Sequence, residues 1–324
     1  MNRLAPKKTD IWVIPVILLV SVAFGYIAGF RPFGIGLDFL NYQFFYDDIR
    51  SSDKFSYFRF EPGFVYVAAM FKSFTGLDYT YFAAFLMTLS LIIKLSVLKR
   101  LDHPVLAVIF YLSAWYPLLE NTQVRIAFAT SLMFLATDKM IEKRWTWFLL
   151  LSAIASTFHL TAAAAATGLA AASFLARYRL RYSIPLIGLG GLALSAFITT
   201  IMLYATQLNP LLLLQDTGSN SPNIFSVLNI AIFLFLIFFV ASGSAKENRR
   251  RIFFLVTCGG FMVLLVFFQI PVIAQRLKEL LMVFMTFIAF EYRLNSKALP
   301  QTILATLVAG GSLYSAISYG LFSN

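Results

Sequence analysis

The residues of this chain that could do chemistry are a few polar and charged side chains set among long apolar runs. Asn121, Gln123 and Arg125 stand where one run begins, and His159 stands in the middle of another. Polar and ionisable groups are costly inside apolar segments, so those that occur there are candidates for function. These four positions are therefore the first candidates for a site.

Arg125 has the chemistry of an anion site. Asn121 and Arg125 are four residues apart, so on a helix they share one face. A guanidinium at a helix start can bind a diphosphate through forked hydrogen bonds, whereas the structural alternative is an arginine that extends toward lipid headgroups. Gln275 and Arg276 stand at a second such start and offer another cation, although Arg276 could instead pair with Glu279.

His159 lies between Thr157 and Thr161, near the centre of the apolar run Trp145–Ala176. A lone histidine there could bind phosphate, accept a proton from a sugar hydroxyl, or serve only as a structural hydrogen-bonding group. Basic residues flank both ends of the run, so both ends belong on the same side of a membrane. The chain must then turn back near the middle, and we predict a helical hairpin with its bend around Phe158 and His159.

The segment 30–61 mixes aromatic rings with carboxylates and amides. Rings stack on sugar faces and acids bind hydroxyls, so Tyr42 and Tyr57 are candidate binding residues on a carbohydrate surface, and Arg59 is a candidate beside Glu61 at the mouth of the next element. The alternative is an ordinary solvated loop with interfacial tyrosines. Glu61 differs from the rest, because Pro62 suits a first helical position and would hold Glu61 rigidly at the start of that helix.

The signatures of the common soluble enzymes are missing. The sequence has no P-loop, no zinc-type cysteine or histidine pairs, no GxSxG and no dinucleotide-binding glycine pattern. It has two histidines, so a histidine-based metal site is not expected, and we expect no cofactor and no metal. A net charge of +11 would suggest nucleic acid in a soluble protein, but in a membrane protein it reports basic residues on the cytoplasmic side.

Composition indicates what must hold these residues in place. Hydrophobic residues make up 60% of the 324 and charged residues 13%, with a mean hydropathy of +0.79. Continuous apolar runs of about 20 residues favour membrane-spanning helices over β-strands. We predict an all-α, polytopic bundle of about ten to twelve helices in a single transmembrane domain, 1–324. The expected segments are 11–29, 79–98, 104–118, 124–138, 146–158, 160–176, 183–205, 223–242, 252–270, 277–291 and 299–320.

The basic residues predict the orientation. With a cytoplasmic N-terminus and an uncleaved first helix, most lysines and arginines, Lys94 and Arg251 among them, fall on the cytoplasmic side. The segments 30–61 and 206–222 then form extracytoplasmic loops, and the second has no basic residue. If the short run near 62–76 crossed the membrane, every later loop would lie on the side opposite to the one its charges indicate. We therefore predict a half-helix or re-entrant element there.

Four short stretches carry a resemblance to a known family. They are Phe60-Glu61-Pro62-Gly63-Phe64, Asn121-Thr122-Gln123-Val124-Arg125-Ile126-Ala127, Thr157-Phe158-His159-Leu160-Thr161-Ala162 and Ala274-Gln275-Arg276-Leu277. In these stretches the chain resembles the EpsG family, within the Wzy-type polysaccharide polymerases. It departs from the family where Ile126 follows Arg125 in place of glutamine, and where Lys278 and Glu279 stand in place of a tyrosine.

The resemblance implies a metal-independent glycosyltransferase similar to the multi-spanning GT-C class, at the outer face of a bacterial inner membrane. It would join undecaprenyl-diphosphate-linked oligosaccharide units into exopolysaccharide, capsule or O-antigen. Arg125 and Arg276 would stabilise the diphosphate, and Glu61 or His159 would orient or deprotonate the attacking hydroxyl. A flippase and a chain-length regulator would be its partners, and nucleic acid would not.

Three alternatives stand beside the polymerase. An O-antigen-type ligase would use the same donor with another acceptor, and the sequence does not separate it from a polymerase. A flippase or transporter would bind the same diphosphate without breaking a bond, but transporters usually show a two-fold repeat, and none is evident. A membrane acyltransferase would place its histidine in more polar surroundings than Phe158 and Leu160 provide.

Overall fold

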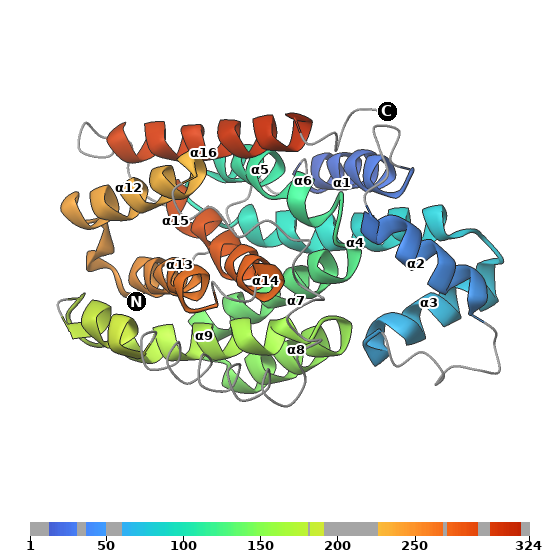
Figure 1. The fold of residues 1–324 in the computed structure, drawn as a ribbon, viewed down its shortest axis with the longest axis horizontal. Coiled ribbons are helices and arrows are strands. Elements are labelled where there is room, and N and C mark those ends of the chain that lie inside the picture. The colour runs from blue at the N-terminus through green and yellow to red at the C-terminus, as the bar shows by residue number, and fades with distance from the viewer. Residues whose placement is uncertain are drawn as a thin grey trace, which may run out of the picture. The chain divides into compact units, whose positions relative to one another are not determined.

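The computed structural model describes residues 13–30, 37–49, 60–180, 182–190, 226–267, 271–290 and 299–318. Every regular element in these ranges is a helix, which confirms the predicted all-α class (Figure 1). The chain divides into two compact units, Met1–Ala162 with Ser312–Asn324, and Ala163–Gly311. Each unit is described by itself.

The helices of the first unit follow the apolar runs closely, with one exception. They are α1 (Val13–Phe30), α2 (Leu37–Asp48), α3 (Pro62–Thr75), α4 (Tyr79–Leu98), α5 (Pro104–Ala114), α6 (Tyr116–Leu119), α7 (Val124–Ile141) and α8 (Trp145–Phe158). The exception is α2, which lies inside the segment predicted as a loop. Its apolar positions are mostly aromatic and three aspartates lie among them, so hydropathy does not mark it. A helix is present where the half-helix near 62–76 was predicted, and its re-entry into a membrane stays a prediction.

Two glycines bring α1 against α4. A Cβ on Gly25 would lie 2.1 Å from Thr88 Oγ1, and one on Gly29 would lie 2.5 Å from the Ala84 Cβ. Small residues four apart let helix backbones approach closely, and in a membrane this close packing replaces the missing hydrophobic driving force. The other side of α1 stays open, with Leu19 71% exposed.

The core of the first unit is α7, which packs against α4 and α8 (Figure 1). The Ser90 hydroxyl of α4 donates to the Ala127 carbonyl of α7 at 3.1 Å. Further along both helices, Arg100 donates to Asp138 at 2.5 Å. These contacts make α4 and α7 parallel, so their C-terminal ends lie on one side, as the charge pattern predicts. Which compartment that side faces stays a prediction.

Lys94 and Glu120 form a fully buried ion pair inside the first unit. The ammonium lies 2.5 Å from Glu120 Oε1, and neither side chain has exposed area. The Tyr111 hydroxyl donates to the same carboxylate, 2.7 Å from Oε1 and 2.9 Å from Oε2. Lys94 is therefore a buried, paired charge rather than an exposed one, and its place on the cytoplasmic side stays a prediction. The buried Lys94 ammonium is tolerated in the interior because the Glu120 carboxylate and the Tyr111 phenol surround it.

Two short helices, α2 and α3, pack beside the first turns of α4 (Figure 1). The Tyr46 ring stacks on Phe82 with centroids 5.4 Å apart, and its hydroxyl donates to the Leu77 carbonyl at 2.9 Å. From α3, the Lys72 ammonium donates to the Tyr46 and Asp47 carbonyls at 2.7 and 2.8 Å. Lys72 thereby satisfies carbonyls that the end of α2 leaves without helical partners.

The second unit is also helical in its described parts. It holds α9 (Thr161–Leu175), whose first two residues belong to the first unit, α12 (Val227–Ala241), η1 (Ser244–Lys246), α13 (Asn248–Val266), α14 (Pro271–Met282), η2 (Val283–Met285), α15 (Thr286–Ala289) and most of α16 (Leu299–Ser318). Residues 182–190 are helical, whereas the rest of the predicted segment 183–205 and the predicted loop 206–222 lie outside the described residues.

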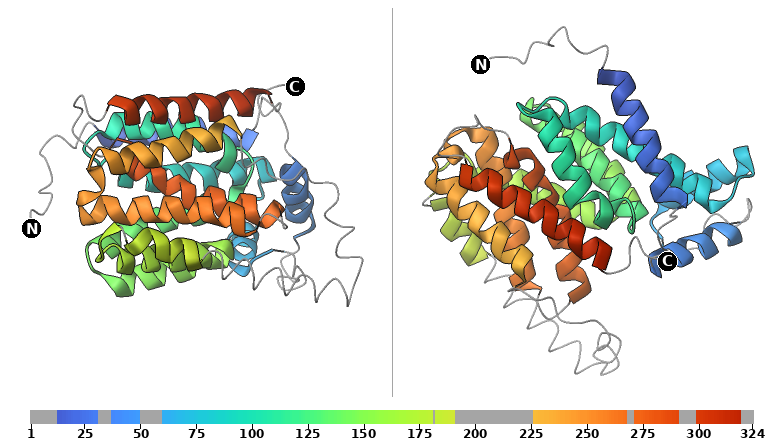
Figure 2. Two further views of the ribbon diagram at one scale, coloured as in Figure 1. Left: turned by 60° about the vertical axis from the view of Figure 1, so that its left-hand side comes forward. Right: turned by 90° about the horizontal axis from the view of Figure 1, so that it is seen from above.

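Polar contacts tie these helices together at their ends. The Arg251 guanidinium donates to the Ala176 and Tyr178 carbonyls at 2.8 and 3.0 Å, so it joins the end of α9 to the start of α13. It is thus a helix cap rather than a free loop charge. On another side, α16 lies along α12 (Figure 2), and Gln301 donates to the Phe238 carbonyl at 2.9 Å.

The surfaces of several helices are strongly apolar. By length and composition, α1 and α4 could each cross a bilayer, and four shorter apolar helices accompany them, at Pro104–Leu119, Trp145–Phe158, Thr161–Leu175 and Val227–Ala241. Apolar side chains on α12 and α16 are exposed, such as Val227 at 85% and Leu307 at 58%. Large exposed apolar surfaces mark contact with lipid or another partner. The number of crossings stays a prediction.

Candidate functional site

Glu61 is the centre of a polar cluster in the first unit. It is the residue before α3 and has extended backbone angles, φ −67° and ψ 144°, as a residue before proline prefers. Pro62 begins the helix, and the Glu61 side chain makes no hydrogen bond to the backbone of that helix. The carboxylate is therefore available to groups from other helices.

The two oxygens of Glu61 contact different partners. Oε1 lies 2.8 Å from His159 Nδ1 and accepts a hydrogen bond from the Leu160 backbone N–H at 3.2 Å. Oε2 accepts a hydrogen bond from Arg125 Nη1 in an ion pair. The cluster thus joins the start of α3, the start of α7 and the break between α8 and α9. Three of the four predicted catalytic residues lie in direct contact through this one carboxylate.

Arg125 is held between the acid and two aromatic rings. Its Nε donates to the Tyr42 hydroxyl at 3.2 Å, and its guanidinium carbon lies 5.3 Å from the Tyr42 ring centroid and 4.8 Å from that of Phe60. The side chain is 12% exposed. Stacking against rings and forked hydrogen bonding both suit arginine better than lysine. Of the five N–H donors of a guanidinium, the contacts with Tyr42 and Glu61 use two.

His159 lies where α8 ends and before α9 begins, so the chain breaks its helix at the predicted position, whereas the return of α9 along α8 as a hairpin stays a prediction. Its backbone is extended, with φ −158° and ψ 120°. The side chain is 8% exposed, and its Nδ1 faces Glu61. Its Nε2 is buried and has no hydrogen-bond partner in the described part of the chain. Buried polar atoms in native proteins nearly always have partners, so an orphaned one points to function.

The charge state of Glu61 follows from these neighbours. Burial alone would raise its pKa, but the hydrogen bond with His159 and the charge of Arg125 outweigh that effect and lower the pKa from 4.5 to about 2. Glu61 is therefore ionised at every physiological pH. Because the pKa is lowered, the pairing stabilises the folded protein above about pH 4.5, and this stabilisation is lost as the pH falls toward 2.

A close helix contact sets the distance between these groups. A Cβ on Gly63 would lie 2.3 Å from Thr157 Oγ1 and 2.8 Å from the Thr157 carbonyl oxygen. Glycine at this position lets the first turn of α3 touch the last turn of α8. Glu61 and His159 flank this contact, two residues away on each chain segment, so the glycine brings them within hydrogen-bonding distance.

The other candidates near Arg125 have different surroundings from those predicted. Asn121 is buried in a turn, and α7 begins only at Val124, so the prediction that Asn121 and Arg125 share a helix face is wrong. The turn forms because the Glu120 and Asn121 N–H groups both bond the Tyr116 carbonyl, at 3.0 and 3.1 Å. Gln123 is half-buried and stands immediately before α7. The candidates Tyr57 and Arg59 lie outside the described residues.

The C-terminal candidates belong to the second unit. Gln275 and Arg276 lie on α14, where the Gln275 amide donates to Glu279 at 3.1 Å. On the same helix, the Lys278 ammonium donates to Asn229 of α12 at 3.3 Å. Whether Arg276 also pairs with Glu279 stays a prediction. A shared site of Arg276 and Arg125 stays a prediction, since each unit is described by itself.

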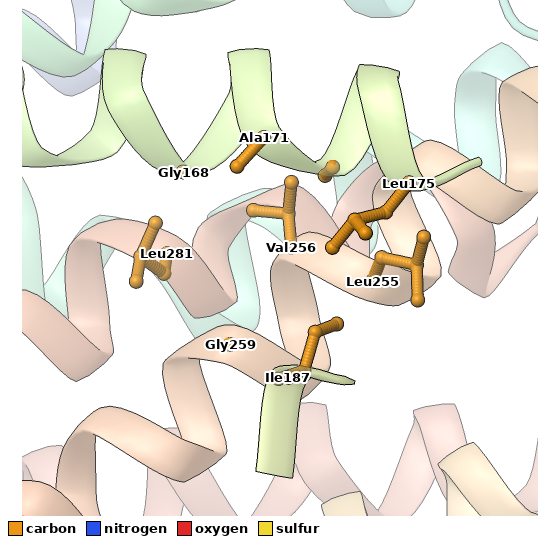
Figure 3. Close-up of a pocket in the computed structure, with 9 residues that line it drawn as sticks. Gly168, Ala171, Leu175, Ile187, Leu255, Val256, Gly259 and Leu281 are labelled. Atoms are coloured by element: carbon orange, nitrogen blue, oxygen red, sulfur yellow. The ribbon is translucent and has the colours of Figure 1, made fainter. Parts of the chain in front are cut away.

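A pocket in the second unit has different chemistry. It lies between α9 and α13, and Leu175, Val256 and Leu281 are among its lining residues (Figure 3). Every lining residue is apolar or glycine, so the pocket offers no group that could bind charge or move a proton. The Glu61 cluster is therefore the better candidate for chemistry.

Sequence reasoning missed two members of the cluster. The Phe60 ring beside Arg125 stands in the sequence next to Glu61, and the rule that arginine stacks on aromatic rings could have suggested it. The Leu160 N–H leaves no sequence signal, because it depends on the backbone path after α8. Together the cluster offers one fixed carboxylate, one guanidinium with unused donors and one imidazole nitrogen. Such a set can bind an anion and accept a proton.

Strongly apolar helices, two of them long enough to cross a bilayer, indicate a membrane protein, and the buried polar cluster at its helix ends is the candidate site. The chain belongs to the EpsG family, whose sequence model matches residues 13–319. No curated protein and no solved structure matches the chain. Family membership supports a membrane protein with a polymerase-type role in polysaccharide biosynthesis.

Proposed function

We propose that this protein is a polysaccharide polymerase that joins undecaprenyl-diphosphate-linked oligosaccharide units at the outer face of a bacterial inner membrane. It transfers the growing chain from its lipid diphosphate to a hydroxyl of the next lipid-linked unit. The contact of Glu61 with both Arg125 and His159 is the observation that supports this most strongly. Anion binding and hydroxyl activation, the two tasks of the reaction, meet at that carboxylate.

Arg125 is the group that contacts the leaving diphosphate. Diphosphate leaves without acid help, so the protein needs preorganised donors where negative charge develops. The unused N–H donors of Arg125 supply them while Glu61 and Tyr42 hold the guanidinium in place. A well-placed donor of this kind contributes about 10²–10³-fold in rate.

The charges of Glu61 and Arg125 cancel, so a diphosphate needs at least one more cation. We assign that role to Arg276, with Gln275 beside it. The remaining candidates, Arg59, Asn121, Gln123, Tyr42 and Tyr57, contribute to binding the sugars and the diphosphate. A flippase that delivers the lipid-linked units and a chain-length regulator are the partners that such a reaction requires.

Purified protein incubated with a single defined lipid-diphosphate oligosaccharide tests the function. A ladder of products that differ by one repeat unit is expected, with free lipid diphosphate released in equal amount. A single transfer to a different acceptor would show a ligase instead. Unchanged substrate that crosses a vesicle membrane would show a transporter. Either of these last two results would overturn the polymerase.

Gly63→Ala should slow chain growth without unfolding the protein. The added Cβ would overlap Thr157, so α3 must move away from α8 and Glu61 must move away from His159. A misplacement of about 1 Å in an active site can cost about 10²-fold in rate, and we expect a loss of at least about tenfold here. The rate of ladder formation measures the effect.

Gly310→Ala is the matched control, since a Cβ at that helical position meets nothing within 4 Å. It should leave the rate unchanged. A Gly63→Ala protein as fast as the Gly310→Ala protein would show that the contact of α3 with α8 does not set the site.

A further inference from the structure

We infer that His159 Nε2 is the base that takes the proton from the attacking sugar hydroxyl, and that Glu61 positions it. This inference rests on the proposed function. The hydroxyl proton moves to Nε2 while the hydroxyl oxygen forms a bond to the anomeric carbon of the growing chain. The bond from that carbon to the diphosphate oxygen breaks, and its electron pair leaves with the diphosphate. The imidazolium then returns its proton to water.

Glu61 is a poor base in this cluster, because both of its oxygens already accept hydrogen bonds. Oε1 contacts His159 and the Leu160 N–H, and Oε2 contacts Arg125. A pKa of about 2 agrees with this geometry, since a good base needs a pKa near the working pH. The guanidinium of Arg125 has no acceptor atom. Of the three groups, only the imidazole can take up a proton.

The partner of Nδ1 determines which imidazole nitrogen is basic. An ionised carboxylate only accepts hydrogen bonds, so Nδ1, 2.8 Å from Glu61 Oε1, must carry the hydrogen. In the neutral ring Nε2 then holds a lone pair. That atom is buried and has no partner among the described residues, so a substrate hydroxyl could serve as its donor. The carboxylate also stabilises the imidazolium formed when the proton arrives.

Among the described residues, few charged groups surround this histidine. Glu61 faces it from the start of α3, and Arg125 of α7 lies on the far side of the same carboxylate. The helices on either side of it, α8 and α9, contain no charged residue. Glu61 is the charged group in direct contact with His159 among the described residues, so substitution of either residue tests the pair.

His159→Gln should lower the rate of chain growth by about 10²–10⁴-fold, the usual contribution of a general base. Binding of the lipid-linked unit, measured by competition, should change by less than about threefold. The acid limb of the pH–rate profile should disappear. Glu61→Gln should lower the rate as well, because an amide can donate to Nδ1 and so leave the hydrogen on Nε2.

His103→Gln is the matched control, since it removes the other histidine at the start of α5. Its rate and pH profile should equal those of the unsubstituted protein. An unchanged rate or pH profile in His159→Gln, or a loss of substrate binding as large as the loss of rate, would overturn the assignment. If the unsubstituted protein makes no polymer, the proposed function fails instead.

A second measurement covers the case in which His159→Gln does not fold. In the His103→Gln protein His159 is the one histidine left, so diethyl pyrocarbonate modifies it without competition from another imidazole. Modification should abolish chain growth, and the lipid-linked substrate should protect against it. Full activity after complete modification of this histidine would contradict its role as the base.

Discussion

Replacing Arg125 with lysine is expected to lower chain growth by at least about 10²–10³-fold, although the charge is kept. A lysine ammonium is a compact point charge with no planar fork. It cannot contact Glu61 and Tyr42 and also present further aligned donors to a diphosphate. It also lacks the flat face that lies against the Tyr42 and Phe60 rings. The rate of ladder formation in proteoliposomes measures the loss.

Arg100→Lys provides the matched control. Arg100 also donates to a carboxylate, Asp138, but its side chain is 44% exposed and lies at the opposite end of α7 from Arg125. Its replacement should leave the rate within about twofold, because exposed ion pairs contribute little. An Arg125→Lys protein that retains more than a tenth of the rate would show that forked hydrogen bonding is not needed at this position.

Lys94→Met should destabilise the protein by about 3–5 kcal/mol, because it leaves Glu120 buried without its cation. Both side chains of the pair are fully buried, so water cannot replace the missing partner. Adding Glu120→Gln should recover most of the loss, since the pair is then neutral and the amide oxygen still accepts from Tyr111. Reversible denaturation in detergent gives the free energy of unfolding of the unsubstituted protein, of Lys94→Met and of the double variant.

Lys139→Met is the comparison for this experiment, since Lys139 also bonds a glutamate, Glu142, at 3.1 Å but at the surface. Loss of this surface ion pair should lower the free energy of unfolding by about 0–1 kcal/mol. If Lys94→Met is no more destabilising than Lys139→Met, or if Glu120→Gln gives no recovery, the buried pair does not hold the turn before α7 in place.

Much of the fold could be predicted because apolar runs dominate this sequence. Runs such as Val13–Phe30 and Tyr79–Leu98 are continuous and long enough to cross a bilayer, so hydropathy and length identify them. The break at His159 follows from a run too long for one helix. Glu61 could be selected because Pro62 fixes the start of a helix beside it.

The missed features depend on contacts between segments far apart in the sequence. Lys94 reads as a charge near a helix end, and only its contact with Glu120, 26 residues away, shows that it is buried. The Gly25 and Gly29 spacing was readable as a packing motif, but its partner on α4 was not. The helix α2 was missed because its stability comes from aromatic packing against α3 and α4 rather than from an apolar run.

The candidate site was predictable in its residue types but not in its connections. Arg125 and His159 each stand out as polar groups in apolar surroundings. That one Glu61 carboxylate joins them, and so leaves Nε2 of His159 as the basic atom, depends on side-chain geometry that no spacing rule supplies. The share of Arg276 in the same reaction remains a proposal.

Photolabelling with a lipid-diphosphate oligosaccharide that carries a photoreactive group near its anomeric carbon tests the central claim most directly. The label should fall on peptides that contain Glu61, Arg125 or His159, and excess unlabelled substrate should suppress it. Label confined to peptides at the other ends of these helices, around Arg100 and Asp138, would contradict the proposal that this cluster is where the glycan chain is transferred.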